Sequence, residues 1–177
     1  LAADIVVLAT GLEMLPIGGI DLSVDGAQID LPAEVSYKGA MLSGVPNFVF
    51  TVGYTNASWT LKADLVADYT CRLLPFMKRR GYTAFWPVAP EDGGVAPIID
   101  LNAGYVTRAL DKLPRQGSRW PWKLRQNYPF DLVTLRYGKL QDEGVRFTSE
   151  RRTSQRRTKS GSRRSMMSSS TSAVSGA

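Results

Sequence analysis

The sequence contains no histidine and only one cysteine, Cys71, among its 177 residues. Without histidine the chain cannot form a Ser-His or Cys-His nucleophile system, a histidine general base or most kinds of zinc site. We therefore expect no metal centre. A single cysteine also excludes an internal disulfide, which favours a reducing compartment. Cys71 lies within a predicted helix, where a small apolar filler is a commoner role than a reactive thiol.

Long hydrophobic runs and glycine-rich phosphate loops are absent as well. No apolar run approaches the roughly 20 residues that a membrane helix needs, and no signal peptide is recognisable. We therefore predict a cytoplasmic protein, with peripheral membrane contact as an open alternative. The sequence has 16 glycines, yet none of them forms a Gly-x-Gly-x-x-Gly motif. The usual loop for a dinucleotide pyrophosphate is thus missing.

The net charge of +6 is confined to one end of the sequence. Residues 151–177 hold seven basic residues and no acid, whereas the other 15 basic residues stand against all 16 acids. The tail is rich in Ser and Arg and has almost nothing to bury, so we predict disorder over 149–177. The chain is 44% hydrophobic overall, which predicts a globular part over 1–148.

Two apolar runs have the character of strands buried on both faces of a parallel or mixed sheet. They are Asp4–Ala9 and Phe48–Val52. Between them, Ile20–Val24 and Ala27–Leu31 alternate apolar and polar residues around Asp25-Gly26. An Asp-Gly pair favours a two-residue hairpin turn, because both positions require a positive φ.

The longest predicted helix runs from about Ser58 to Leu74, where apolar residues recur at helical spacing (Leu61, Leu65, Tyr69 and Leu73). Asn56 or Ser58 could cap its first turn, and Pro75 should end or kink it before Gly81. Residues 82–97 are predicted as a loop. A shorter helix capped by Asn102 and reaching Leu110 is expected afterwards. The pattern of residues 131–137 fits either a helix or a strand, and Pro129 at a first helical position favours the helix.

Several motifs resemble the C-terminal region of class B flavin-dependent monooxygenases of the Baeyer–Villiger type, in particular the ethionamide-activating type. The first is a strand ending in Ala9-Thr10-Gly11, which by itself is common among flavoproteins. A longer and more specific motif is YKGAMLSGVPNFVFTVGYTNASW, over residues 37–59. The resemblance continues through Gly104–Arg108, Leu113–Ser118 and Pro121-Trp122, and extends in order from Asp4 to about Phe147.

The resemblance implies an α/β fold, as the C-terminal piece of a flavoprotein with two dinucleotide-binding domains, one for FAD and one for NAD(P). It implies that the enzyme uses FAD and NADPH. One oxygen atom from O₂ would then enter a ketone, giving an ester, or go onto the sulfur of a thioether or thioamide. No nucleic acid is expected as a partner, and the oligomeric state stays open.

The resemblance also suggests which residues lie along the flavin ring edge: Thr55, Asn56, Ser58, Trp59, Leu61 and Lys62. The free N–H groups and positive end of a helix starting here suit the negative charge of a reduced flavin. Trp59 could also line the substrate pocket. The plainer alternative is that Asn56 and Ser58 are only helix caps and that Trp59 is only a core residue.

Other interpretations of the sequence remain open. Because the sequence begins at Leu1 within an apparent strand and lacks phosphate loops, we expect a fragment that is inactive alone. A disulfide reductase-like flavoprotein would need a cysteine pair, and only Cys71 is present. A non-enzymatic alternative is a binding module that works through the basic tail. The aromatic and basic segment 115–128 could stack on single-stranded nucleic acid, or could pack over the core as the family implies.

Overall fold

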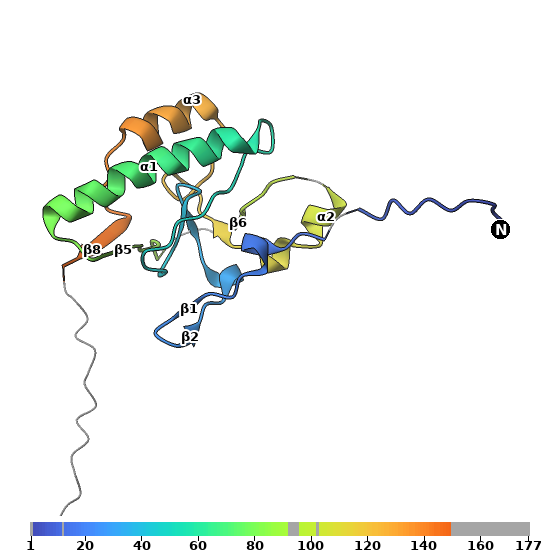
Figure 1. The fold of residues 1–177 in the computed structure, drawn as a ribbon, viewed down its shortest axis with the longest axis horizontal. Coiled ribbons are helices and arrows are strands. Elements are labelled where there is room, and N and C mark those ends of the chain that lie inside the picture. The colour runs from blue at the N-terminus through green and yellow to red at the C-terminus, as the bar shows by residue number, and fades with distance from the viewer. Residues whose placement is uncertain (1, 12, 92–95, 102, 150–177) are drawn as a thin grey trace, which may run out of the picture.

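The computed structural model describes residues 2–11, 13–91, 96–101 and 103–149. It is a mixed helix and strand structure dominated by one long helix, α1 (Trp59–Arg80), which lies beside α3 (Tyr128–Asp131) (Figure 1). A π-helical turn over Leu132–Tyr137 continues α3 along α1. The short helix α2 (Gly104–Thr107) lies away from this pair (Figure 1).

The described residues form four two-stranded sheets, all antiparallel. The predicted hairpin is confirmed, since Asp25 and Gly26 both have positive φ angles between its two strands. The strand pairs are β1 (Ser23–Val24) with β2 (Ala27–Gln28), β3 (Ser36–Tyr37) with β4 (Met41–Leu42), β5 (Ala84–Pro87) with β8 (Val145–Thr148), and β6 (Ala96–Pro97) with β7 (Arg115–Gln116).

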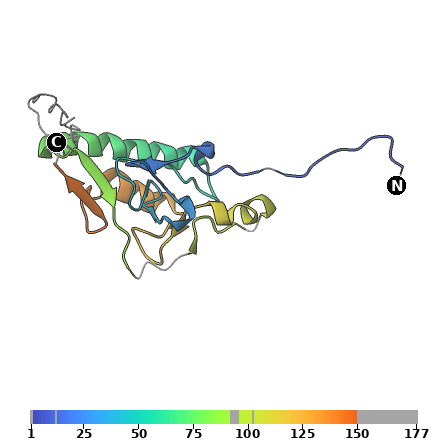
Figure 2. The same ribbon diagram turned by 90° about the horizontal axis from the view of Figure 1, so that it is seen from below.

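The structure corrects both buried-strand predictions. Residues 4–9 form no strand and extend away from the rest of the molecule (Figure 2). Ile5 is 83% exposed, because the described residues offer no sheet into which this segment could insert. Residues 48–52 are not assigned as a strand either. They run alongside residues 39–40, with Phe50 and Val52 donating their N–H groups to the carbonyls of Ala40 and Gly39.

The long helix is confirmed, but its predicted end is wrong. Pro75 is exposed and lies inside α1, which continues to Arg80 and ends at Gly81 in the left-handed conformation (φ 69°). The buried face of α1 explains this continuation, because Leu73 and Met77 on either side of Pro75 pack into the core. Tertiary packing therefore outweighs the cost of the missing backbone hydrogen bond.

Two hydrophobic clusters form the core. The larger one gathers the inner face of α1 with β3, β4, β5 and β8, and includes Tyr37, Met41, Phe85 and Trp122. The smaller one lies under residues 98–113 and includes Val52, Ile98 and Val106. The segment from 82 to 97, predicted as a loop, contains β5 and β6. β5 forms because Phe85 packs into the larger cluster, whereas β6 is exposed and pairs with β7.

The remaining predictions have different outcomes. The predicted extension of the second helix to Leu110 is wrong, since α2 ends at Thr107 and a separate 3-10 turn begins at Leu110. The helix favoured by Pro129 is confirmed, and Asn127 caps it by accepting the N–H of Phe130 at 2.9 Å. Asn102 lies outside the described residues, and Ala103 is the N-cap of α2. The predicted disordered tail, apart from Ser149, also lies outside them.

Candidate functional site

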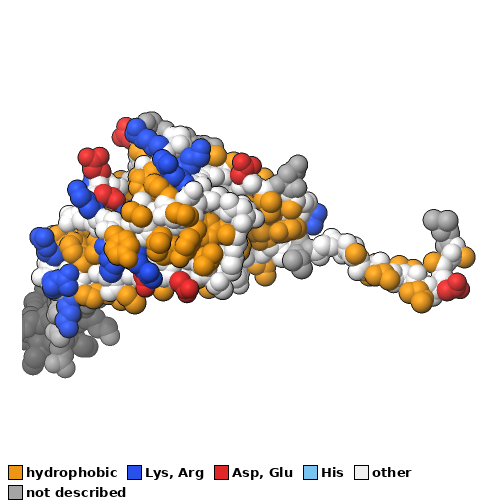
Figure 3. Space-filling model, turned by 90° about the horizontal axis from the view of Figure 1, so that it is seen from above, with side chains coloured by type: hydrophobic (Ala, Val, Ile, Leu, Met, Phe, Trp, Pro, Cys, Tyr) orange, Lys and Arg blue, Asp and Glu red, His pale blue; other side chains and the backbone are white. Residues whose placement is uncertain are grey.

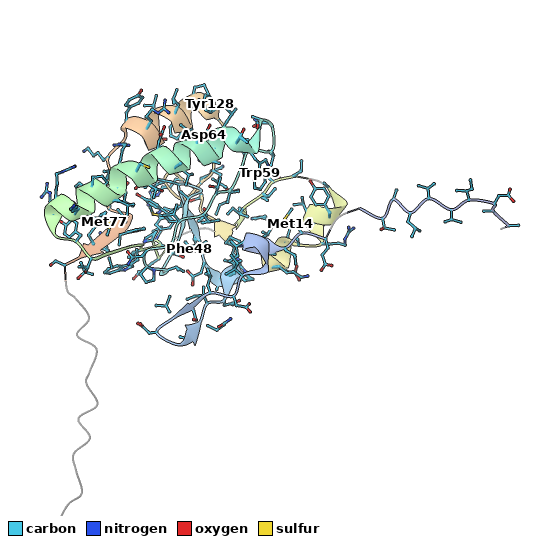
Figure 4. All side chains as sticks on the ribbon, viewed as in Figure 1. Met14, Phe48, Trp59, Asp64, Met77 and Tyr128 are labelled. Atoms are coloured by element: carbon cyan, nitrogen blue, oxygen red, sulfur yellow. The ribbon has the colours of Figure 1, made fainter. Side chains whose placement is uncertain are left out.

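The candidate site is the loop that leads from Val52 into the first turn of α1. Trp59 lies at the start of the helix, with Met14 and Phe48 on the segments beneath it (Figure 4). The Trp59 ring covers Gly53 so closely that a Cβ atom there would lie 2.1 Å from the ring. Only glycine fits at position 53, and the contact holds the indole over the loop although 54% of Trp59 is exposed.

Gln126 fixes the exposed part of this loop from the opposite side. Its Oε1 accepts the backbone N–H of Thr55 at 2.8 Å, and its carbonyl oxygen accepts the side-chain amide of Asn56 at 3.1 Å. The Thr55 hydroxyl reaches the same Oε1 at 3.3 Å. Gln126 has a positive φ of 50°, a conformation that costs energy for a residue other than glycine. The sequence alone did not point to Gln126.

The helix start differs from the predicted cap. Ser58 is the N-cap residue, yet its side chain makes no capping bond and instead pairs with the Thr60 hydroxyl at 2.7 Å. Asn56 is not a cap either, because its amide is directed to Gln126. No side chain of the described residues caps the first turn, so the end of a 22-residue helix offers unpaired N–H donors.

Lys62 lies one turn further on and is buried, with 1% of its surface exposed. Its Nζ donates to Asp131 Oδ2 at 2.9 Å, and the hydroxyl of Tyr54 donates to the same oxygen at 2.8 Å. Burial lowers the pKa of Lys62, and the Asp131 carboxylate acts in the opposite direction. Burial and the bond to Asp131 raise the pKa of Tyr54. This triad joins the loop, α1 and α3 at one point.

An apolar groove of about 440 Å³ adjoins the loop. Its lining includes no Asp, Glu, Lys or Arg side chain, and the Thr51 hydroxyl and the Trp59 indole N–H are its polar side-chain groups. The groove suits an uncharged, apolar ligand, since a charge buried here would have no counter-charge. Trp59 belongs both to this groove and to the loop. Representative lining residues are Met14, Leu15, Phe48, Phe50, Trp59 and Ile99.

The structure therefore brings the six predicted residues to one end of α1, but their side chains differ in solvent exposure. Thr55, Asn56, Ser58 and Trp59 are exposed, and Leu61 is half-buried. Lys62 alone faces the interior, where Asp131 already compensates its charge. Two further observations concern the described residues only. No group of three or more His, Cys, Asp or Glu side chains is placed to hold a metal ion, and no helix is long and apolar enough to cross a membrane.

Comparison with known proteins identifies relatives along most of the chain. It is 41% identical over 161 residues to the probable FAD-binding monooxygenase AlmA of Acinetobacter baylyi, a match that covers 90% of the chain and 32% of AlmA. It is 44% identical over 149 residues to the putative FAD-containing monooxygenase MymA of Mycobacterium tuberculosis, covering 83% of the chain and 30% of MymA. The chain is thus a homologue of the FAD-containing monooxygenases.

Within this class the chain is a homologue of the EthA type. It is 51% identical over 152 residues to the FAD-containing monooxygenase EthA of Mycolicibacterium smegmatis, a match that covers 85% of the chain. EthA of Mycobacterium tuberculosis is also 51% identical, over 148 residues. The chain spans about 30% of the length of these relatives. No family model and no solved structure matches it. The resemblance inferred from the motifs is confirmed.

Proposed function

We propose that the chain forms the pyrimidine side of the flavin site, and one wall of the substrate pocket, in an FAD- and NADPH-dependent monooxygenase. The proposal also covers the fold, as part of a flavoprotein with two dinucleotide-binding domains. The observation that carries it is the uncapped first turn of α1 behind a fixed polar loop, in a homologue of FAD-containing monooxygenases. When bound, FAD supplies the activation of O₂ and, once reduced, negative charge on its pyrimidine ring.

The residues present fit this role. Unpaired N–H groups at a helix start and the positive end of the helix dipole stabilise negative charge. Five residues would lie along the edge of the flavin ring: Thr55, Asn56, Ser58, Trp59 and Leu61. Lys62 would act from behind, since its bond to Asp131 fixes the position of the first turn. Preorganised donors of this kind need no rearrangement as charge develops.

The apolar groove would take the substrate. With no ionisable lining residue, it favours neutral, apolar compounds, and Trp59 would separate the groove from the ring edge. We propose ketones, oxidised to esters, and thioethers or thioamides, oxidised on sulfur, as the substrates. A closed apolar wall also excludes water from the reacting atoms, which limits the loss of reducing equivalents.

The proposal can be tested in a chimera in which residues 1–148 replace the matching part of EthA from Mycolicibacterium smegmatis. Asn56→Leu removes the bond to Gln126 that orients the loop. We expect the variant to retain FAD but to release severalfold more hydrogen peroxide per NADPH consumed, at the expense of oxygenated product. Gln141→Leu, an exposed change outside the loop, serves as the matched control.

Three results would contradict the proposal. A chimera that folds without binding FAD would argue against the flavin site as a whole. An Asn56→Leu variant with unchanged coupling would show that the loop does not touch the ring. Reduction by NADH in preference to NADPH would contradict the proposed reductant alone.

A further inference from the structure

A second hollow, separate from the apolar groove, lies beside the start of α3. It has a volume of about 730 Å³ and is lined by residues 118–120, 123–125, 127 and 130. Three of the lining side chains are cations (Arg119, Lys123 and Arg125), and none is acidic. No acid among the described residues pairs with Lys123 or Arg125. The hollow therefore carries the uncompensated positive charge of Lys123 and Arg125.

Aromatic rings form the other part of the lining. Trp120 and Phe130 are half-buried and meet edge to face, with 4.9 Å between their ring centres. The guanidinium of Arg125 lies 4.6 Å from the centre of the Phe130 ring. Cations beside aromatic faces are the combination that binds a phosphorylated aromatic molecule, since the charge takes the phosphate and the ring stacks on the base.

The segment that carries these side chains is held in place by its own backbone. The N–H groups of Trp122 and Lys123 both donate to the Arg119 carbonyl at 2.9 Å, and the Leu124 N–H donates to Gln116 Oε1 at 2.9 Å. Gly117 packs so tightly that a Cβ atom there would lie 2.6 Å from Trp122. The hollow is thus a preformed feature, which lowers the ordering cost of binding.

We propose that this hollow binds a free nucleotide, recognised by its phosphate charge and its aromatic base. The aromatic rings next to the hollow limit the number of bases that the ligand can stack there. Trp122 is only 5% exposed and packs on Tyr37, while Tyr128 packs against Tyr54. Neither ring is available to continue a stacking track, so the site accommodates one base and not a strand. The proposal is independent of FAD, although Gln126, next in sequence to the lining residue Asn127, bonds to the loop at residues 55–56.

The full 177-residue chain can be titrated at low salt with ADP, adenosine, pyrophosphate and an oligothymidylate, following tryptophan fluorescence and heat. We expect ADP to bind about fivefold or more tightly than adenosine or pyrophosphate, because it alone engages both the charge and the ring. Trp120→Leu should weaken ADP and adenosine by a similar factor while leaving pyrophosphate unchanged.

Charge variants test whether nucleotide binding depends on the cations of the hollow or only on the net positive charge of the chain. Lys123→Gln/Arg125→Gln should weaken ADP at least about fivefold. The control Lys78→Gln/Arg79→Gln removes two exposed charges from the last turn of α1 and should change the affinity less than about twofold. Lys123→Gln alone leaves the Arg125–Phe130 contact in place, and it should weaken ADP binding even if the double variant folds poorly.

Several outcomes would overturn the proposal. Pyrophosphate binding as tightly as ADP would reduce the hollow to a diffuse cationic surface. Equal losses in the two double variants would show that the position of the charges is unimportant. Oligothymidylate that binds more tightly than ADP and loses affinity in the Lys123→Gln/Arg125→Gln variant would show that the hollow accepts a strand and not a single nucleotide.

Discussion

Two buried tyrosines show how the surroundings of a side chain determine its hydrogen bonds and its pKa. Tyr37 and Tyr69 both lie in the larger core cluster, on β3 and α1. The Tyr37 hydroxyl donates to both carboxylate oxygens of Asp142, at 2.8 and 2.7 Å. The Tyr69 hydroxyl is buried and has no hydrogen-bond partner among the described residues. Burial raises the pKa of both phenols above the ordinary value of 10.0.

We predict that Tyr69→Phe stabilises the chain. An unpaired buried hydroxyl costs free energy, so removing it should raise the free energy of unfolding by about 1 kcal/mol at pH 7. The raised pKa adds a pH effect. The phenol stays protonated in the folded chain but ionises in the unfolded chain, so stability is intact below pH 10 and falls as pH rises further.

Tyr69→Phe should therefore also reduce the alkaline loss of stability by about 1.4 kcal/mol per pH unit above pH 10. Urea unfolding from pH 7 to 11.5 measures both effects. Tyr37→Phe is the control, since it loses the bonds to Asp142 and should be less stable at pH 7 while showing the same reduced alkaline slope. A destabilised Tyr69→Phe would show that its hydroxyl has a partner after all.

At the scale of elements, α1 and α3 are far apart in the sequence and meet through the Lys62–Asp131 pair. Both side chains are almost fully buried, at 2% and 4% exposure. Such a pair contributes little net stability, but losing one partner leaves an uncompensated charge in the interior. The pair therefore acts mainly to fix the relative position of the two helices and of the loop before α1.

We predict strong coupling between these two positions. Lys62→Met should lower the free energy of unfolding by about 3–5 kcal/mol, whereas Lys62→Met/Asp131→Asn should stay within about 2 kcal/mol of the parent chain. Asparagine can still accept the Tyr54 hydroxyl. Chemical unfolding of the two single variants and the double variant measures the coupling energy, and strictly additive losses would contradict the inference.

The single variant Asp131→Asn should change how the free energy of unfolding depends on pH. Burial already lowers the pKa of Lys62 below its ordinary 10.5, and removing the carboxylate should lower it further. The unfolded chain then binds the extra proton, so the variant should regain stability as the pH rises towards 10.5. A flat difference from the parent chain over pH 7–10.5 would contradict the prediction, because it would mean that removing the Asp131 carboxylate leaves the protonation of Lys62 unchanged.

The whole molecule presents apolar surface. Hydrophobic side chains gather over the middle of one face, with basic side chains towards its edges (Figure 3). Ile5, Val6, Val7 and Leu8 are each at least 74% exposed. The matched relatives are about three times as long as the chain, and the phosphate loop motif is absent from its sequence. In the proposed function, the chain therefore supplies one side of the flavin site and the phosphate loops belong to the rest of the enzyme.

We predict that the 177-residue chain does not retain FAD or NADPH through gel filtration. Ring contacts alone cannot replace the backbone N–H groups that hold a pyrophosphate. The chimera with EthA serves as the positive control and should elute with stoichiometric FAD. Co-elution of FAD with the unfused chain would show that its own residues supply the phosphate contacts.

Sequence alone determined the features that rest on local chemistry. The Asp25-Gly26 hairpin follows from two positions that require positive φ, and the helix from Trp59 follows from apolar residues at helical spacing. The family follows from motifs that are continuous in the sequence, so they can be recognised without knowing which residues are in contact. The six site residues stay a prediction, although the structure gathers them at one end of α1.

Only the tertiary structure decided what depends on partners distant in the sequence. Packing of Leu73 and Met77 carries α1 through Pro75, and the part of the chain that the structure describes offers residues 4–9 no strand to pair with. Gln126 and Asp131 became visible as site residues only through their bonds to residues about 70 positions earlier. No local pattern encodes such contacts, because burial and hydrogen-bond partners are properties of the folded chain and not of a sequence window.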